Sequence, residues 1–196
     1  HLSSKLSGTY QSAKMAASVL GDDRIQVIDG RTASGGTGLL ALEAARLARL
    51  GADMRKILEQ VEELKKKIRV CFTVDTLEYL RRNGRIGKAA AFLGTILSIR
   101  PLLAIDDGEV MPVEKVRGSR ERVLKRLVEV IAERMPGGKV ARGIVMHAAE
   151  PARGAALKES LERQASCKDL LIGSIGPVIG SHGGPGTIGA ALYPVD

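Results

Sequence analysis

Small hydroxyl side chains, glycines and a histidine gather in three short segments of this sequence, residues 6–9, 34–38 and 180–189. Each segment precedes a helix or a predicted helix. The first turn of a helix offers unpaired backbone N–H groups and a partial positive charge, so these residue types suit a phosphate or a carboxylate there. Taken singly, Ser7 and Ser34 are better explained as helix caps.

Motifs of the common phosphate loops and nucleophiles are missing. Gly35-Gly36-Thr37-Gly38 lacks the G-x-G-x-x-G spacing of a dinucleotide loop, and no G-x-x-x-x-G-K-[ST], G-x-S-x-G or S-x-x-K occurs. The three histidines and two cysteines are scattered and show no metal-ligand spacing. Serine hydrolase chemistry, a metal site and a disulfide scaffold are therefore disfavoured.

His182 and two arginines stand among turn residues. In the segment 181–186 the imidazole of His182 has almost no other side chains around it, so a ligand could approach it. The alternative is a ring that hydrogen-bonds a neighbouring carbonyl and supports the loop. Arg85 and Arg117 also lie in turns, whereas most other basic residues fall on helix faces where solvent covers them.

Hydrophobic periodicity predicts the elements that position these residues. The apolar stripe from Met54 to Ile68 is the clearest signal and predicts an amphipathic helix. Further helices are predicted over residues 10–20, 39–50, 78–83, 119–135 and 151–164. Strands are predicted over residues 25–29, 70–74, 102–105, 109–113, 140–147, 170–175 and 177–181, the third and fourth forming a hairpin.

The order of these elements predicts an α/β fold in two parts. Strands and helices alternate at first, which favours a parallel layer, and the remainder differs because it contains the hairpin. We place a domain change near residue 70. Residues 1–69 then form a parallel-sheet domain, and residues 70–196 form a second α/β domain with a mixed sheet.

Composition restricts the class of protein further. Hydrophobic residues make up 44% of the 196 residues and aromatic residues only 3%, and the formal charge is +8. The charge would attract an anionic partner, but few rings are available for stacking on bases, so an RNA-binding module is the least favoured reading. No run of about eighteen apolar residues predicts a membrane span and no signal peptide is evident, so we expect a cytoplasmic protein.

Four separated segments, in order, resemble the DegV family of bacterial fatty-acid-binding proteins. They are SSKLSGTYQSA at residues 3–13, DTLEYLRRNGRI at residues 75–86, the run from RPLL through DG to KVRG at residues 100–118, and HGGPG at residues 182–186. The resemblance implies a two-domain α/β protein that encloses a long-chain fatty acid, such as palmitate, between its domains. It implies no cofactor, no metal and no catalytic residue.

The resemblance also implies roles for individual residues. The Ser7 hydroxyl would bind the carboxylate, with the Gly8 and Thr9 backbone close by. Arg85, Arg117 and His182 match basic positions around the head group, where they would steady the carboxylate or meet a partner. That partner would be a separate fatty-acid kinase, which makes the acyl phosphate from ATP while the carrier itself performs no bond-making step.

Two further expectations follow from the family pattern. Family members begin with another segment that contains a first strand and a hydroxyl-bearing loop, so we expect an N-terminally truncated chain with an incomplete parallel α/β/α first domain. The tunnel wall is expected from residues 89–94 and 96–99, although ordinary core packing explains these segments equally well. The alternative function is an α/β enzyme acting on a small phosphorylated metabolite through the Gly35 and Gly186 loops.

Overall fold

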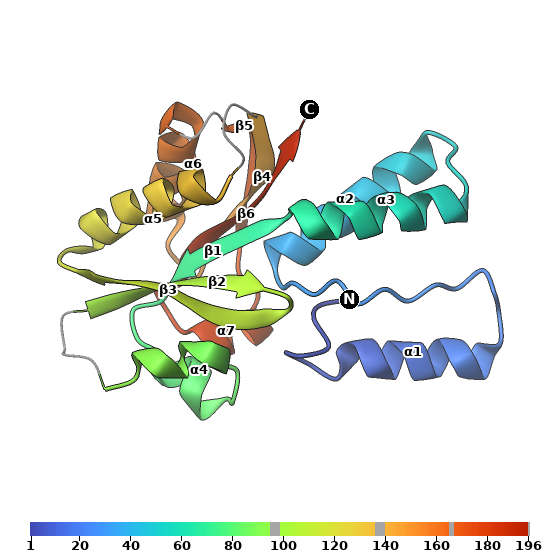
Figure 1. Cartoon of the computed structure of the whole chain (residues 1–196), viewed down its shortest axis with the longest axis horizontal. Coiled ribbons are helices and arrows are strands. Elements are labelled where there is room, and N and C mark those ends of the chain that lie inside the picture. Colours follow the sequence, from blue (N-terminus) through green and yellow to red (C-terminus); the bar gives the residue numbers. More distant parts are fainter. Residues whose placement is uncertain (95–98, 136–139, 165–166, 196) are drawn as a thin grey trace.

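The computed structural model describes residues 1–94, 99–135, 140–164 and 167–195, and its centre is a six-stranded mixed sheet (Figure 1). The strand order is β3-β2-β1-β6-β4-β5. Only β4 and β5 pair in parallel, and the other neighbours are antiparallel. The strands are β1 Arg69–Thr73, β2 Ile99–Asp106, β3 Glu109–Arg117, β4 Val140–His147, β5 Cys167–Ser174 and β6 Ile188–Val195.

Helices cover both faces of this sheet. They are α1 Thr9–Leu20, α2 Gly35–Arg49, α3 Met54–Lys67, α4 Glu78–Arg82, the short 3₁₀ helix η1 Gly87–Phe92, α5 Arg120–Arg134, α6 Pro151–Gln164 and α7 Pro177–Gly183. The six predicted helices and the β2–β3 hairpin are thus confirmed. Ser119 caps α5 as its sequence suggests, because its side chain accepts a hydrogen bond from the Arg122 amide.

The predicted strand over residues 25–29 is wrong. This segment is extended, but no strand of the described sheet lies beside it, and a β-rich run needs a neighbouring strand to complete its hydrogen bonds. Its backbone is held instead by His1, whose amino group donates to the Ile28 carbonyl at 2.9 Å. The Gly30 amide donates to the His1 carbonyl, also at 2.9 Å.

The predicted strand over residues 177–181 is also wrong, because this segment is helix α7. Gly176 is extended and Pro177 occupies the first helical turn, where its missing N–H costs nothing. The β-favouring pair of Val178 and Ile179 concealed this helix start. The last strand is β6, which was not predicted and which lies in the middle of the sheet between β1 and β4.

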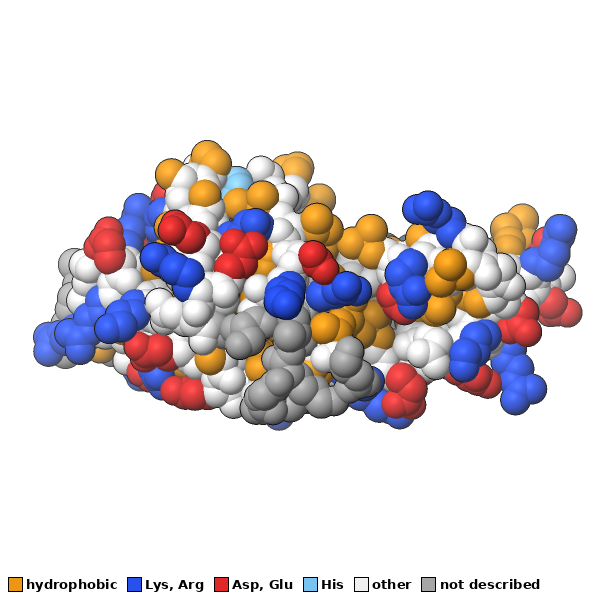
Figure 2. Space-filling model, turned by 90° about the horizontal axis from the view of Figure 1, so that it is seen from above, with side chains coloured by type: hydrophobic (Ala, Val, Ile, Leu, Met, Phe, Trp, Pro, Cys, Tyr) orange, Lys and Arg blue, Asp and Glu red, His pale blue; other side chains and the backbone are white. Residues whose placement is uncertain are grey.

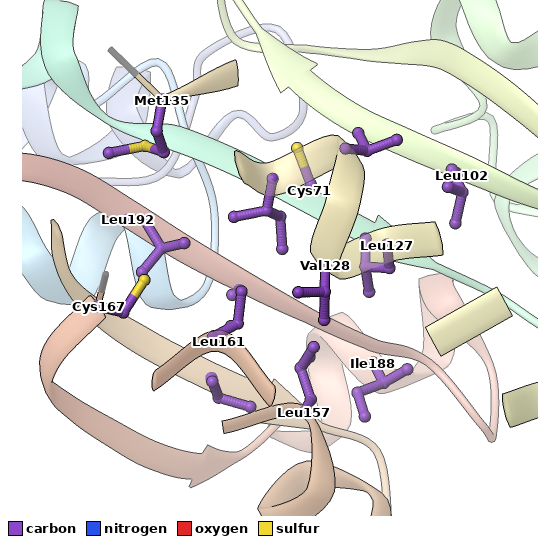
Figure 3. Close-up of a cluster of buried hydrophobic side chains, with 14 of the residues drawn as sticks. Cys71, Leu102, Leu127, Val128, Met135, Leu157, Leu161, Cys167, Ile188 and Leu192 are labelled. Carbon is purple, nitrogen blue, oxygen red and sulfur yellow. The ribbon is translucent and has the colours of Figure 1, made fainter. Parts of the chain in front are cut away.

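The two faces of the sheet bury different clusters. On one face α5 and α6 pack against the central strands, and Leu127, Leu157 and Leu192 lie together there (Figure 3). On the other face α2 and α3 pack against Val70 and Met146. Side chains alternate between faces along a strand, so Val70 and its neighbour Cys71 belong to opposite clusters.

The N-terminal helix differs from the rest of the fold. α1 contains no buried residue, and it lies apart from α2 and α3 in Figure 1. Every strand of the described residues belongs to the sheet between Arg69 and Val195. A domain division near residue 70 stays a prediction. None of the helices in the described part of the chain has the length and apolarity that crossing a membrane requires.

Candidate functional site

A cavity of about 170 Å³ lies on the sheet face opposite α5 and α6. This volume is about tenfold the space that a single water molecule needs. The sheet contributes an apolar floor, formed by Val70, Phe72, Ile105, Val110 and Met146. The other walls come from the N-terminal segment, the loop before α2, α4 and α7, and their apolar members include Leu2, Leu6, Leu80, Val178 and Ile179.

Hydroxyl groups reach this apolar cavity from the turn before α1. Ser7 and Thr9 both line it, and their hydroxyl oxygens lie 2.8 Å apart. The Thr9 amide also donates to Ser7 Oγ at 3.3 Å. The N-cap position of α1 is Gly8, which has no side chain, so the Ser7 hydroxyl is the group that accepts from the first amide of this helix. The two hydroxyls therefore remain suited to a polar group at the end of an apolar ligand.

Polar contacts at its base fix the position of this turn. Ser3 is fully buried, and its hydroxyl donates to the Gly108 carbonyl at 2.7 Å. Its own carbonyl accepts hydrogen bonds from the Leu6 and Ser7 amides at 3.0 and 3.1 Å. The turn that carries Ser7 is thus tied to the β2–β3 hairpin, about a hundred residues away in sequence.

A second tie joins the same segment to residue 29. Asp29 accepts hydrogen bonds from the Ser4 hydroxyl at 2.6 Å and from the Ser4 amide at 3.1 Å. Burial by itself would raise the pKa of Asp29, but the Ser4 hydroxyl and the amides of Arg31 and Ser4 lower it below its ordinary value. The carboxylate is therefore ionised near neutral pH and holds the N-terminal segment in place.

Arg85 enters the site from the turn after α4. Its Nε donates to the Leu6 carbonyl at 3.0 Å and its Nη1 donates to the Asn83 carbonyl at 2.7 Å. A guanidinium group has five N–H donors, and these two hydrogen bonds to described residues use two of them. Arg85 lines the cavity, and its bond to Leu6 brings the α4 turn against the segment that carries Ser7.

His182 reaches the site from α7, which packs against α4. It lines the cavity, and its Nδ1 is buried with no hydrogen-bond partner among the described residues. The expected alternative, a ring bonded to a carbonyl through this nitrogen, is therefore not found. An imidazole nitrogen in this position is suited to a ligand with a polar head.

The structure brings together four of the six residues predicted for the site. Ser7, Thr9, Arg85 and His182 line one cavity. Gly8 is exposed beside it. Arg117 is not a lining residue, because it ends β3 opposite Ile99 and is exposed.

The described residues that were predicted for the tunnel wall do not line the cavity. None of residues 89–94 lines the cavity, and Ala89 packs behind the wall, in a buried cluster with Leu77 and the lining residue Leu80. Residues 96–98 lie outside the described residues. Sequence reasoning missed the true floor because strand side chains reveal which face they occupy only after pairing and register are known.

Ser34, from the second of the three candidate ligand-binding segments, lines the cavity. Its side chain makes no cap hydrogen bond to α2, and its backbone has φ 51° and ψ −122°, a conformation that favours glycine. A serine held in this conformation adds a hydroxyl-bearing residue to the cavity wall, which also includes Thr187. The signal in the sequence was the clustering of Ser34 with glycines.

Two of the backbone amides that a phosphate could use at the Gly35 loop already have hydrogen-bond partners. The Gly35 amide donates to Met146 Sδ at 2.7 Å, and the Gly36 amide donates to the Ala33 carbonyl at 3.1 Å. At the other loop, the Asp75 carboxylate lies against Gly186. These contacts disfavour phosphate at both loops.

Other chemistries find little support in the described residues. Among these residues, no group of three or more His, Cys, Asp and Glu side chains is placed to hold a metal ion. Burial raises the pKa of Cys71 and Cys167 to about 11, so both thiols are protonated near neutral pH. On the face shown in Figure 2, acidic and basic side chains are interspersed, so the positive charge forms no single basic patch there.

Fold and site define a mixed α/β protein with an apolar cavity edged by hydroxyl, guanidinium and imidazole groups. The chain belongs to the DegV family: the family model described as "uncharacterised protein, DegV family" matches residues 1–195. A DegV domain-containing protein of Halalkalibacterium halodurans is 36% identical over 98% of this chain and 68% of its own length.

Two solved structures are similar over the whole chain. A DegV family protein from Thermus thermophilus, described as fatty acid binding, has a TM-score of 0.93 and 35% identity. DegV of Bacillus subtilis, described as a fatty acid binding protein, has a TM-score of 0.82 and 33% identity. In each case the match covers 100% of this chain and 69% of the other.

Proposed function

We propose that this chain binds a long-chain fatty acid, such as palmitate, with its acyl chain in the cavity and its carboxylate at Ser7. The observation that carries the proposal is the apolar floor beside the Ser7 and Thr9 hydroxyls, with Arg85 and His182 in the same wall. The solved relatives from Thermus thermophilus and Bacillus subtilis are described as fatty acid binding, which supports it.

Apolar and polar groups contribute differently to the binding that we propose. Each methylene taken out of water contributes about 0.8 kcal/mol, so the tail supplies most of the affinity. A carboxylate removed from water must receive hydrogen bonds, and Ser7, the backbone of Gly8 and Thr9, and the nitrogens of Arg85 and His182 are the donors at hand. The polar groups therefore fix the orientation of the ligand.

We also propose a fate for the bound fatty acid. The protein is a cytoplasmic carrier and not an enzyme, and it presents the carboxylate to a fatty-acid kinase. Arg117, exposed and away from the cavity, belongs in this proposal to the surface that meets the kinase. The alternative, an enzyme acting on a phosphorylated metabolite, is disfavoured by the engaged Gly35 amide and by the Asp75 carboxylate beside Gly186.

Ligand binding by the delipidated protein tests the proposal. Palmitate is expected to raise the melting temperature, whereas nucleotides and sugar phosphates leave it unchanged. Ser7→Ala is expected to weaken palmitate binding about tenfold, because it removes a hydrogen bond to a charged group. Ser18→Ala, which removes an exposed hydroxyl on α1, is the matched control and is expected to bind as the wild type does.

Two results would overturn the proposal. One is the recovery of no acyl chain by mass spectrometry from the purified protein, together with no stabilisation by added palmitate. The other is stabilisation by a sugar phosphate or nucleotide in place of palmitate. Equal palmitate affinity in Ser7→Ala and wild type would remove Ser7 from the carboxylate site.

A further inference from the structure

We propose that Asn83 is a positioning residue whose side chain holds His182 at the wall of the cavity. It lines no part of the cavity itself, and the role rests on the proposed function only in so far as the cavity holds a fatty acid. The inference comes from the hydrogen bonds that Asn83 makes on both sides of α4.

Asn83 connects three segments that are far apart in sequence. Its Nδ2 donates to the Ser181 carbonyl of α7 at 3.1 Å and to the Tyr79 carbonyl of α4 at 2.9 Å. The backbone carbonyl of Asn83 accepts from Arg85 Nη1 at 2.7 Å, and Arg85 Nε donates to the Leu6 carbonyl. A continuous set of hydrogen bonds thus runs from the N-terminal segment through the α4 turn to α7.

His182 lies next to the peptide group that this connection holds. Among the described residues no hydrogen bond fixes its buried Nδ1, so the placement of the α7 backbone contributes to the position of the ring. The carbonyl that Asn83 holds belongs to Ser181, the residue next to His182. Fixing that peptide group fixes the side chain that follows it.

α7 itself needs such a contact. It has only 7 residues, Pro177–Gly183. Gly176 precedes it and Gly184, whose φ is 81°, follows it. Glycines at both ends and at positions 180 and 183 leave the backbone little intrinsic stiffness. The ring of Tyr79 lies against Gly184, so α4 supports the helix at its end as well as at Ser181.

Helix capping alone does not account for these contacts. The bond from Asn83 to the Tyr79 carbonyl satisfies the end of α4 and would suffice for a cap. The bond to Ser181 spans 98 residues and does nothing for α4 itself. A capping role and a positioning role therefore predict different consequences when the amide is replaced.

Three substitutions separate these roles. Asn83→Asp keeps the shape of the side chain but has no N–H to donate, and Asn83→Ala removes the group. Asn83→Gln keeps the amide on a longer stem and is expected to restore part of the effect. Thr73→Val is the matched control, because Thr73 Oγ1 donates to the Pro101 carbonyl at 2.9 Å and does not line the cavity.

Two measurements are made on each variant. The first is the NMR signals of the His182 ring in the ligand-free protein, assigned with His182→Gln. The second is palmitate affinity by calorimetry. We expect Asn83→Asp and Asn83→Ala to shift the ring signals and to weaken palmitate binding about three- to tenfold, the loss of one hydrogen bond. Thr73→Val is expected to lower stability and to change neither.

The outcomes are distinguishable from those of the proposed function. If wild type binds no palmitate while Asn83→Asp still shifts the His182 ring signals, the fatty-acid proposal fails and the positioning role stands. If Asn83→Asp leaves the ring signals and the affinity as in wild type, the positioning role is wrong. An equal shift in Thr73→Val would show general destabilisation and would also overturn it.

Discussion

The sheet and the N-terminal arm, residues 1–30, are held in place by different forces. In the sheet, Leu102, Leu127 and Ile188 are completely buried between strands and helices. In the arm, helix α1 buries none of its residues, and Val19 is 88% exposed. The arm nevertheless carries Ser7 and Thr9, which supply two of the hydroxyl groups that line the cavity.

This difference shows that the two halves of one site need not share a source of stability. The floor of the cavity is part of the sheet, which buries apolar side chains on both of its faces. The hydroxyl turn is held by hydrogen bonds of Ser3, Asp29 and Arg85. Segments with few buried apolar contacts open at a lower free energy than the core, so the arm can open while the sheet stays folded.

The largest effect is expected from Leu127→Ala in the sheet. Leu127 is completely buried in the cluster between α5 and the strands, and truncating such a leucine removes apolar contacts and leaves a cavity (Figure 3). The free energy of unfolding, measured with urea, is expected to fall by about 2–5 kcal/mol. A loss comparable to that of a surface substitution would contradict the packing of α5.

Much of the fold was predictable from the sequence, because many of its signals involve residues that are close together in the chain. The hairpin around Asp107 and Gly108, the stripe of α3 and the cap at Ser119 each depend on a few neighbouring residues. The two wrong strand predictions have different causes. Residues 25–29 have strand composition but no neighbouring strand, and residues 177–181 form a helix whose proline marks its first turn.

The site was predictable only in part for a related reason. Ser7, Thr9, Arg85 and His182 lie among turn residues that stand out in the sequence, and the structure brings them to one cavity. Val70 and Met146 of its floor look like any other strand residue. Asn83 looks like an ordinary helix stop, and its bond to Ser181 depends on the packing of α4 against α7.

A smaller effect, confined to the arm, is expected from Asp29→Asn. The carboxylate accepts two hydrogen bonds from Ser4, and the folded protein lowers its pKa below the ordinary value of 3.8. The charge therefore stabilises the fold above that pH, and this contribution is lost as the pH falls through the lower, folded-state pKa. After allowance for screening by solvent, we expect a loss of about 1 kcal/mol near neutral pH.

The pH dependence checks the sign of this contribution. The difference in unfolding free energy between wild type and Asp29→Asn is expected to be full near pH 7 and to close below about pH 4. Asp23→Asn, at an exposed position in the same arm, is the control and is expected to leave stability unchanged. A difference that grows towards acid pH would contradict the role of Asp29.

The smallest effect is expected from Val19→Ser on α1. Valine and serine have similar helix propensities, so the substitution mainly reports how much apolar surface Val19 buries. With 88% of Val19 exposed, the unfolding free energy is expected to change by less than about 0.5 kcal/mol. Val123→Ser, at a completely buried position on α5, is the matched comparison and should cost several times as much, because it also buries a hydroxyl in an apolar cluster. A large loss in Val19→Ser would mean that α1 is packed in solution and that the arm and the sheet share one source of stability.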